Sequence, residues 1–242
     1  MKVLAVSPHL DDAAFSVGGT LAVLADAGHD VTVLTCFTRS VPDPQGFALA
    51  CQTDKGLEPE VDYMAVRRRE DDAALAVLGV RQQHLDLPEA PHRGYDSAPA
   101  LFAGARPDDD MWRDVADLLA PLEADLWLAP QGLGAHVDHL QVLRAVAGLR
   151  RPTAWWRDSP YVLRDGAAPP GADLPPGLAT VELPHDRDRR GEACAAYATQ
   201  LGFQFGGVRA MREALADLPE LLLADPRARA VLADRQVRRG HP

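Results

Sequence analysis

The feature that most constrains the fold of this chain is a regular alternation of short apolar runs with longer segments of helical periodicity. Runs of strand length lie at 3–6, 31–35, 83–87 and 126–129, and the helical segments lie at about 16–28, 62–79, 108–121 and 137–150. Gly28 and Gly79 stand where two of these segments end, as is common for left-handed helix C-caps. This order predicts an α/β protein whose mostly parallel sheet is covered by helices on both faces.

The expected connectivity is that of a Rossmann-like, doubly wound sheet. With the common strand order 3-2-1-4, the strands at 3–6 and 126–129 are neighbours, and right-handed crossovers send the helices after them to opposite faces. A crevice then opens at the carboxyl ends of these two strands. Residues that follow the two strands are expected to meet there, although more than 120 positions separate them in the sequence.

The length of the chain fits one large domain. With 242 residues, of which 47% are hydrophobic, the chain can bury a substantial core. We expect a single domain over 1–242, made of a core at 1–150 and a C-terminal β/α extension at 151–242. In the extension, the residue pattern favours strands near 153–156, 161–163 and 178–183, a helix at about 186–200 and a helical tail from Leu218 onward.

Two long stretches rich in proline, glycine and polar residues interrupt the alternation, at 38–60 and 88–107. Loops of more than about 12 to 15 residues in a compact domain are usually functional or disordered. Both stretches follow strand ends at the edge where the crevice is expected. They are therefore candidates for the walls of a substrate pocket.

Composition excludes several classes of partner. The formal net charge of -10 disfavours nucleic acid, which requires a basic face. No apolar run approaches the roughly 18 residues of a membrane span, so no membrane partner is expected. Cys36, Cys51 and Cys194 show no CxxC spacing, which argues against a disulfide framework or a zinc ribbon. We expect a cytoplasmic protein that acts on a small molecule, with a homo-oligomer as a compatible assembly.

Imidazole and carboxylate side chains cluster directly after the first and the fourth of these apolar runs. The first cluster is His9, Asp11 and Asp12, and the second is His136, Asp138 and His139. His9 and Asp12 are three residues apart at the start of a helix, so both side chains can lie on one side of a single turn. His136 and His139 have the same spacing at the start of a later helix.

Donors of this kind suit a catalytic Zn²⁺ site, which has three protein ligands and one open position. His9 and Asp12 supply two ligands. The spacing leaves His136 and His139 as alternatives for the third ligand, and we assign His139, which completes a set of two histidines and one carboxylate. Another divalent ion such as Fe²⁺ would also accept this set.

The remaining polar residues of the two clusters can carry the chemistry. Asp11 is placed to take a proton from an attacking water, as a general base. His136, if protonated, could stabilise an oxyanion and then protonate an amine leaving group. Asp138 could hold His136 or raise its pKa. The structural alternative is that Asp11 or Asp12 only caps a helix and that Asp138 is a favourable acidic residue in a first turn.

Several motifs together resemble the LmbE-like or PIG-L family of zinc-dependent N-acetylglucosaminyl deacetylases. The resemblance rests on the segments Pro8-His9-Leu10-Asp11-Asp12, Gly18-Gly19 and His136-Val137-Asp138-His139, with support from Arg67-Arg68-Arg69-Glu70, Leu87-Pro88-Glu89 and Ala196-Tyr197-Ala198-Thr199-Gln200. It implies that His9, Asp12 and His139 hold the zinc ion. It also implies that Asp11 is the base and that His136 stabilises the tetrahedral intermediate.

The resemblance further implies a substrate, which the spacing of the residues does not show. The substrate would be a conjugate of an N-acetylglucosamine-type sugar, cleaved to acetate and a free amine. An arginine in the helix near position 67 often contacts the substrate in relatives, so Arg67 is our candidate for substrate binding. A solvated helix face is the alternative explanation of the three successive arginines.

The chain departs from the commoner family motifs at three positions. Ala13 follows the paired aspartates where an acidic residue is more common, so a supporting carboxylate is absent or comes from elsewhere. Leu10 and Val137 replace prolines, as in a branch that includes deacetylases acting on glycopeptide antibiotics. The substrate can therefore belong to a different class of conjugate.

Two other functions compete with deacetylation. One is a non-catalytic sugar-binding relative, and the other is a different metal-dependent hydrolase such as a phosphoesterase, whose sites often hold two metals. A nucleotide-binding function is disfavoured because no GxGxxG motif follows the first strand. Gly18 and Gly19 are instead expected to let the first helix pack closely on the sheet.

Overall fold

The computed structural model describes the backbone of residues 1–239 and the side chains of residues 1–233. Within these residues a seven-stranded sheet has the order β3-β2-β1-β4-β5-β7-β6. The strands are β1 (Lys2–Ser7), β2 (Asp30–Thr35), β3 (Arg81–His84), β4 (Leu126–Pro130), β5 (Thr153–Trp156), β6 (Ala179–Glu182) and β7 (Leu221–Ala224).

The first four strands have the predicted 3-2-1-4 order, and β1 to β5 all pair in parallel. β1 and β4 are neighbours, with Leu4 opposite Trp127. The expected α/β class and the mostly parallel sheet are thus confirmed. The sheet is mixed at its other edge, because β7 runs antiparallel to both β5 and β6.

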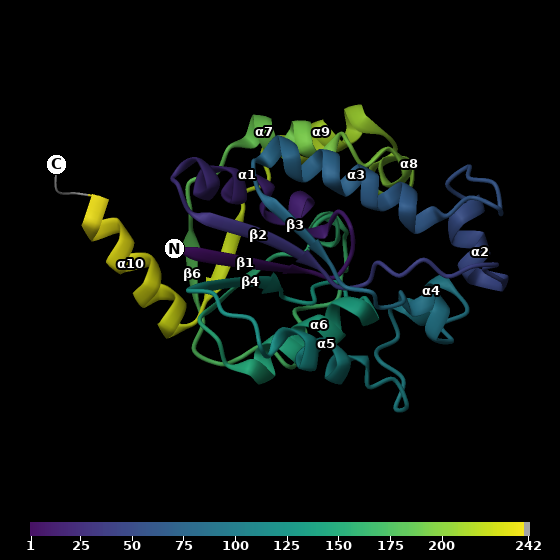
Figure 1. Ribbon diagram of the computed structural model, residues 1–242, viewed down its shortest axis with the longest axis horizontal. Coiled ribbons are helices and arrows are strands. Elements are labelled where there is room, and N and C mark those ends of the chain that lie inside the picture. The colour runs from purple at the N-terminus through teal and green to yellow at the C-terminus, as the bar shows by residue number, and fades with distance from the viewer. Residues whose placement is uncertain (240–242) are drawn as a thin grey trace.

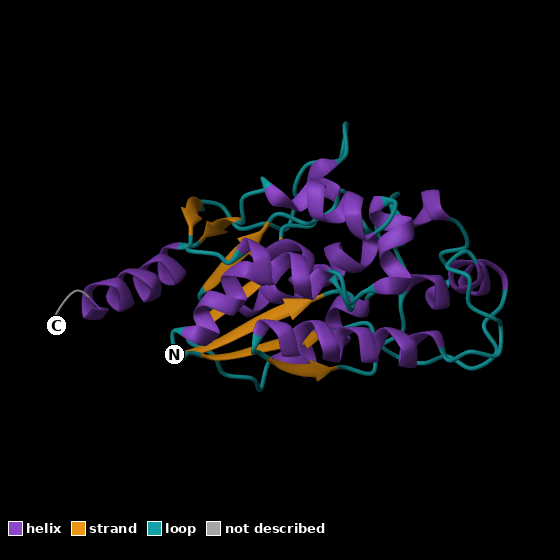
Figure 2. Ribbon diagram, turned by 90° about the horizontal axis from the view of Figure 1, so that it is seen from above, coloured by secondary structure: helices purple, strands orange, loops and turns teal. Residues whose placement is uncertain are grey.

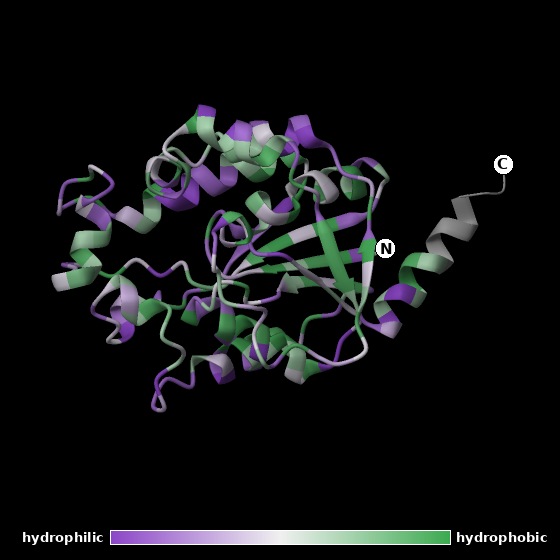
Figure 3. Ribbon diagram, turned by 180° about the vertical axis from the view of Figure 1, so that it is seen from behind, coloured by the Kyte–Doolittle hydropathy of each residue, from purple (hydrophilic) through white to green (hydrophobic). Residues whose placement is uncertain are grey.

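Helices cover both faces of the sheet (Figure 1). On one face lie α1 (Asp12–Asp26), α3 (Tyr63–Leu78), α7 (Arg187–Cys194) and α9 (Val208–Ala216), and on the other lie α5 (Met111–Leu119) and α6 (Val137–Leu149). Each face buries its own apolar cluster, and the strands between them are largely apolar (Figure 3). This double burial explains why the parallel strands read as continuous apolar runs.

The remaining helices lie at the ends of the sheet. They are α2 (Gly46–Thr53), α4 (Ala98–Leu101), α8 (Ala198–Phe205), α10 (Pro226–Arg239) and two 3-10 helices, η1 (Ala90–Arg93) and η2 (Tyr161–Leu163). The parallel strands point toward the end that carries α2 and α4, whereas α10 projects from the opposite end (Figures 1 and 2). No helix among the described residues is long and apolar enough to cross a membrane.

Four of the expected elements in the sequence were wrong in position or type. Residues 161–163 form the 3-10 helix η2 rather than a strand, and the third strand is shifted to Arg81–His84. The tail after Leu218 first forms β7, because its apolar residues pair with β5 in the sheet. The helix expected at 186–200 is two helices, and the second begins where Glu70 accepts hydrogen bonds from the backbone and the hydroxyl of Thr199.

Helix α1 is kinked at Val17, which has φ -141° and ψ 19°. After the kink, the carboxylate of Glu220 accepts hydrogen bonds from the backbone N–H groups of Gly19 (2.9 Å) and Thr20 (2.7 Å). The buried guanidinium of Arg190 lies 3.4 Å from the same carboxylate. A residue from the end of the chain therefore satisfies donors that the kink leaves free.

We expected Gly19 to let α1 pack closely on the sheet, but it lies instead against the segment before α7. A Cβ atom at this position would lie 2.6 Å from the carbonyl oxygen of Asp186, which precedes α7.

We expect Gly19→Ala to destabilise the protein by about 1–3 kcal/mol, because the backbone of Asp186 cannot move away as a flexible side chain can. Urea unfolding measures this change. Gly148→Ala is the control: that helical glycine has open space around it, so alanine should stabilise by about 0.5–1 kcal/mol.

Candidate functional site

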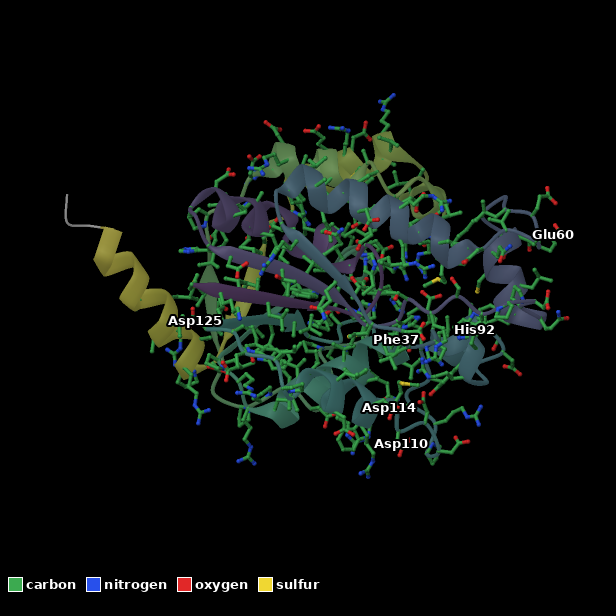
Figure 4. All side chains as sticks on the ribbon, viewed as in Figure 1. Phe37, Glu60, His92, Asp110, Asp114 and Asp125 are labelled. Carbon is green, nitrogen blue, oxygen red and sulfur yellow. The ribbon has the colours of Figure 1, made fainter. Side chains whose placement is uncertain are left out.

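The two polar clusters meet at the carboxyl ends of β1 and β4, as the strand order predicted. The ring centroid of His9 lies 5.0 Å from that of His136 and 5.3 Å from that of His139. Nitrogen atoms of these three histidines all lie within 4.8 Å of one another, so the group could hold a metal ion. In Figure 4, Phe37, whose ring lies 6.1 Å from that of His9, marks this end of the sheet, and Asp125 marks the opposite end.

Asp12 lies between two of the histidines. Its Oδ2 atom is 3.2 Å from Nδ1 of His9 and 3.2 Å from Nε2 of His139. Bonds of 2.0–2.1 Å in a tetrahedral zinc site separate neighbouring donor atoms by about 3.3 Å. His139 Nε2 is buried and makes no hydrogen bond within the described residues. A buried nitrogen whose near neighbour is a carboxylate at this spacing fits a bound cation.

The other nitrogen of each of these two histidines is held by a carboxylate. His9 Nε2 lies 2.9 Å from Asp138 Oδ2, and His139 Nδ1 lies 2.7 Å from Asp158 Oδ1. Such contacts fix the tautomer and orientation of ligating histidines. The contact with His136 that we expected from the Asp138 carboxylate is made by the Asp138 backbone N–H instead.

The electrostatics of these pairs favour positive charge at the centre. Burial opposes it, but the Asp12 and Asp158 carboxylates raise the pKa of His139 to about 9. Burial raises the pKa of Asp12, but the neighbouring His139 and His9 outweigh burial and hold this pKa well below its usual range. The Asp12 carboxylate is therefore ionised at neutral pH. A divalent cation can take the place of the protons on the two imidazoles.

Asp158 was not identified from the sequence. It is fully buried, follows β5, and also accepts a hydrogen bond from the backbone N–H of Leu133 (3.0 Å). The signal that could have identified it is its position just after a strand that neighbours β4, but the order of the strands after residue 150 could not be derived.

We expect Asp158→Asn to weaken metal affinity by about 10- to 100-fold, because the amide cannot hold His139 as the carboxylate does. Competition with a metal-binding dye measures the affinity. Asp217→Asn serves as the control, since the Asp217 side chain is fully exposed on the surface. Equal affinities for the two variants would show that Asp158 does not support a metal ligand.

The backbone of Asp11 is unusual. It has φ 154° and ψ -34°, a conformation that costs about 1–3 kcal/mol and is often found at functional sites. Its side chain does not cap α1, and the first-turn N–H of Ala13 is instead bound by Ser7 Oγ at 3.1 Å. Burial and the adjacent Asp12 charge raise the pKa of Asp11 to about 7. A carboxylate of this kind is suited to accept a proton near neutral pH.

His136 lines the pocket, and a hydrogen bond fixes the tautomer of its ring. Its Nδ1 atom accepts a hydrogen bond from the backbone N–H of Asp138 (3.2 Å), so the neutral ring carries its proton on Nε2. Burial and the nearby His9 lower the pKa of His136 well below its ordinary value. The rings of Phe102 and Tyr161 lie 5.3 Å and 6.5 Å from the His136 ring. His136 is therefore positioned as a neutral hydrogen-bond donor.

Arg67 is buried rather than solvated, unlike the alternative considered for the three arginines. Its Nη1 atom lies 2.5 Å from Glu89 Oε1, and its Nη2 atom lies 3.7 Å from Asp11 Oδ1. Its buried Nε has no hydrogen-bond partner within the described residues. Arg67 thus links the candidate base to Glu89 and keeps one donor free.

These residues line a pocket with a volume of about 220 Å³. Both long loops contribute to its walls, as predicted: Phe47 and Lys55 come from the first loop and Phe102 from the second. The candidate site residues that line it are His9, Asp11, Asp12, Arg67, His136 and Asp138, whereas His139 is fully buried behind them.

The fold and this site define an α/β protein with a candidate metal centre and an adjacent pocket at the carboxyl edge of its sheet. Residues 4–149 match the model of the family described as PIG-L, GlcNAc-PI de-N-acetylase. The chain belongs to this family. The resemblance inferred from the motifs is thus confirmed, and the match ends before Asp158.

Similar curated proteins are deacetylases. The chain is 36% identical over 169 residues to 2'-N-acetylparomamine deacetylase of Streptomyces fradiae, covering 66% of this chain and 57% of that protein. It is 31% identical over 175 residues to 1D-myo-inositol 2-acetamido-2-deoxy-alpha-D-glucopyranoside deacetylase of Corynebacterium glutamicum (strain R), covering 68% of this chain and 59% of that protein. The chain therefore spans less than two thirds of the length of these two relatives.

Similar solved structures cover more of the chain. The zinc-inhibited form of teicoplanin deacetylase Orf2 matches with a TM-score of 0.78 and 25% identity over 92% of this chain and 97% of that chain. The A40926 pseudoaglycone deacetylase Dbv21 matches with a TM-score of 0.71 and 31% identity over 92% of this chain and 96% of that chain. The likeness thus extends past the family match into the C-terminal third.

Proposed function

We propose that this protein is a metal-dependent deacetylase that removes an N-acetyl group from an N-acetylglucosamine-type sugar conjugate, releasing acetate and a free amine. The observation that carries the proposal is the meeting of Asp11, His136 and a set of candidate metal-binding donors beside one pocket. Family membership and the names of the relatives, which include deacetylases of acetamido sugars, support it.

His9, Asp12 and His139 would hold the metal ion, Zn²⁺ or another divalent ion such as Fe²⁺. When bound, such an ion supplies Lewis-acid chemistry: it polarises the acetamide carbonyl and makes a neighbouring water more acidic. The support for this ligand set is the 3.2 Å spacing of Asp12 Oδ2 from Nδ1 of His9 and from the buried Nε2 of His139. His136 would then face the substrate.

Asp11 acts as the general base in this proposal. It takes one proton from the attacking water, whose oxygen forms a bond to the acetamide carbon. As the C–N bond breaks, Asp11 returns the proton to the nitrogen, which leaves as an amine. This assigns to Asp11 the proton transfer that we had considered for His136, because the hydrogen bond at His136 Nδ1 disfavours a protonated ring.

His136 and Arg67 assist this proton transfer in different ways. The Nε2–H of His136 stabilises the negative charge that develops on the carbonyl oxygen. Arg67 holds the Asp11 carboxylate in place, and its free Nε–H is available to a sugar hydroxyl. Asp138 acts as a positioning residue, because its carboxylate binds His9 and its backbone binds His136.

Acetate release from a panel of N-acetylglucosaminyl compounds by zinc-loaded protein tests this function. We expect release from at least one acetamido sugar conjugate. An absence of release from every compound, with one metal ion bound per chain and the sugars still bound, would favour the non-catalytic sugar-binding alternative. Release of phosphate from phosphate esters, without acetate release, would favour the phosphoesterase alternative.

A further inference from the structure

Building on the proposed deacetylase function, we propose that Lys55 forms a second subsite at the mouth of the pocket and binds a carboxylate or phosphate group of the substrate conjugate. The acetamido sugar would occupy the inner part of the pocket beside Asp11 and His136. The group attached to the sugar would extend outward to Lys55, which would make Lys55 a specificity-determining residue.

The position of Lys55 favours this role. Lys55 lies just after α2, is half-buried and lines the same pocket as Asp11 and His136. Its Nζ atom lies 5.3 Å from the ring centroid of Tyr63 and 5.2 Å from that of Phe203. Two aromatic rings therefore hold the ammonium group at a defined place between α3 and α8.

Lys55 differs from the buried arginines beside the site because it forms no ion pair among the described residues. The buried arginines beside the site are paired: Arg67 with Glu89, and Arg93 with Asp138. Within the described part of the chain, Lys55 has no carboxylate within 4 Å, and its one hydrogen bond goes to the Cys51 carbonyl oxygen (2.6 Å). An ammonium has three donors, so two remain for a ligand. Burial and the nearby Arg67 lower the pKa of Lys55 more than the charges of Glu89 and Asp11 raise it, and an anionic ligand would offset this lowering.

A short chain of contacts connects this subsite to the proposed base. The ring of Tyr63 that contacts Lys55 also lies 5.5 Å from the guanidinium of Arg67, one turn further along α3. Arg67 in turn contacts Asp11. A substrate whose acetamido group lies beside Asp11 can therefore extend its attached group along the same pocket toward Lys55. The ring of Phe203, which is 70% exposed, offers an apolar face beside that group.

The alternative is that Lys55 only stabilises the end of α2 through the Cys51 carbonyl. The two roles differ in their effect on substrates. A helix-stabilising lysine would affect neutral and anionic substrates equally, whereas a subsite lysine distinguishes between them. A cationic conjugate would be disfavoured by the ammonium of Lys55.

The test compares three β-glycosides of N-acetylglucosamine that carry a phenyl, a carboxyphenyl or a phosphophenyl group. The dissociation constant is measured by calorimetry and the KM by steady-state kinetics. For wild-type protein, we expect both values to be about 5- to 10-fold lower for at least one anionic glycoside than for the phenyl glycoside. Lys55→Met should remove this difference, and Lys55→Arg should keep most of it. The carboxyl and phosphate compounds show which anion is preferred.

The chain's only other lysine provides a matched control. Lys2 begins β1 at the opposite end of the sheet, so Lys2→Met should leave the preference for anionic glycosides unchanged. No preference in wild-type protein, or a preference that survives in Lys55→Met, would overturn the proposal. Because calorimetry needs no turnover, a failure of the deacetylase proposal would appear separately, as binding of the glycosides without acetate release.

Discussion

Removal of divalent metal by a chelator is expected to abolish acetate release, and re-addition of Zn²⁺ or Fe²⁺ is expected to restore it. The same treatment should lower the thermal midpoint, because a ligand present at 100 times its dissociation constant stabilises by about 2.7 kcal/mol. For a protein of this size, that corresponds to about 5–10 °C. The midpoint reports metal binding independently of activity.

Metal affinity should fall as the pH falls. The pKa of His139 is raised to about 9, so below that pH a proton on the imidazole competes with the cation. Titration calorimetry at pH 8.5 and 6.5 measures the change. His139→Ala should lose the bound metal, and His185→Ala, outside the pocket lining, should keep it. Full activity in metal-free protein would contradict the mechanism.

Replacing Asp11 with asparagine should lower kcat by about 10²- to 10⁴-fold, the usual contribution of a general base. Asparagine has the same shape and adopts unusual backbone conformations more readily than most residues, so it should tolerate the φ of 154°. It cannot accept the proton of the attacking water. Steady-state kinetics, with metal content measured on the same sample, test the prediction.

The control for this variant is Asp72→Asn, at an exposed position on α3. It should retain wild-type turnover. A kcat within about threefold of wild type for Asp11→Asn would place the base at another residue. Loss of metal together with turnover would instead show that Asp11 supports the ligand set.

The meeting of the two polar clusters could be predicted from the sequence because it depends on few rules. Strand order and the handedness of crossovers bring His9 and His136 to one edge of a parallel sheet, whatever the details of packing. The roles of neighbouring residues depend on side-chain directions. The contact of the Asp138 carboxylate with His9, rather than with His136, is of this kind.

The contribution of the C-terminal third could not be predicted. Asp158 binds His139, and the Tyr161 ring lies 5.4 Å from the His139 ring, but both follow a strand whose place in the sheet was unknown. β5 pairs in parallel with β4 on one side, and on its other side lies β7, an apolar run that carries no periodic signal and returns antiparallel. Local pattern alone does not contain this information.

The contact between Glu220 and α1 has a consequence for synthesis on the ribosome. Glu220 is made 201 residues after Gly19, whose backbone it binds. Until then, the N–H groups freed by the kink in α1 lack their carboxylate, and the helix that begins at Asp12 is unfinished. Helix α1 thus completes its fold only after most of the domain has been made, and a nascent chain that stops at residue 149 would contain both polar clusters without this support.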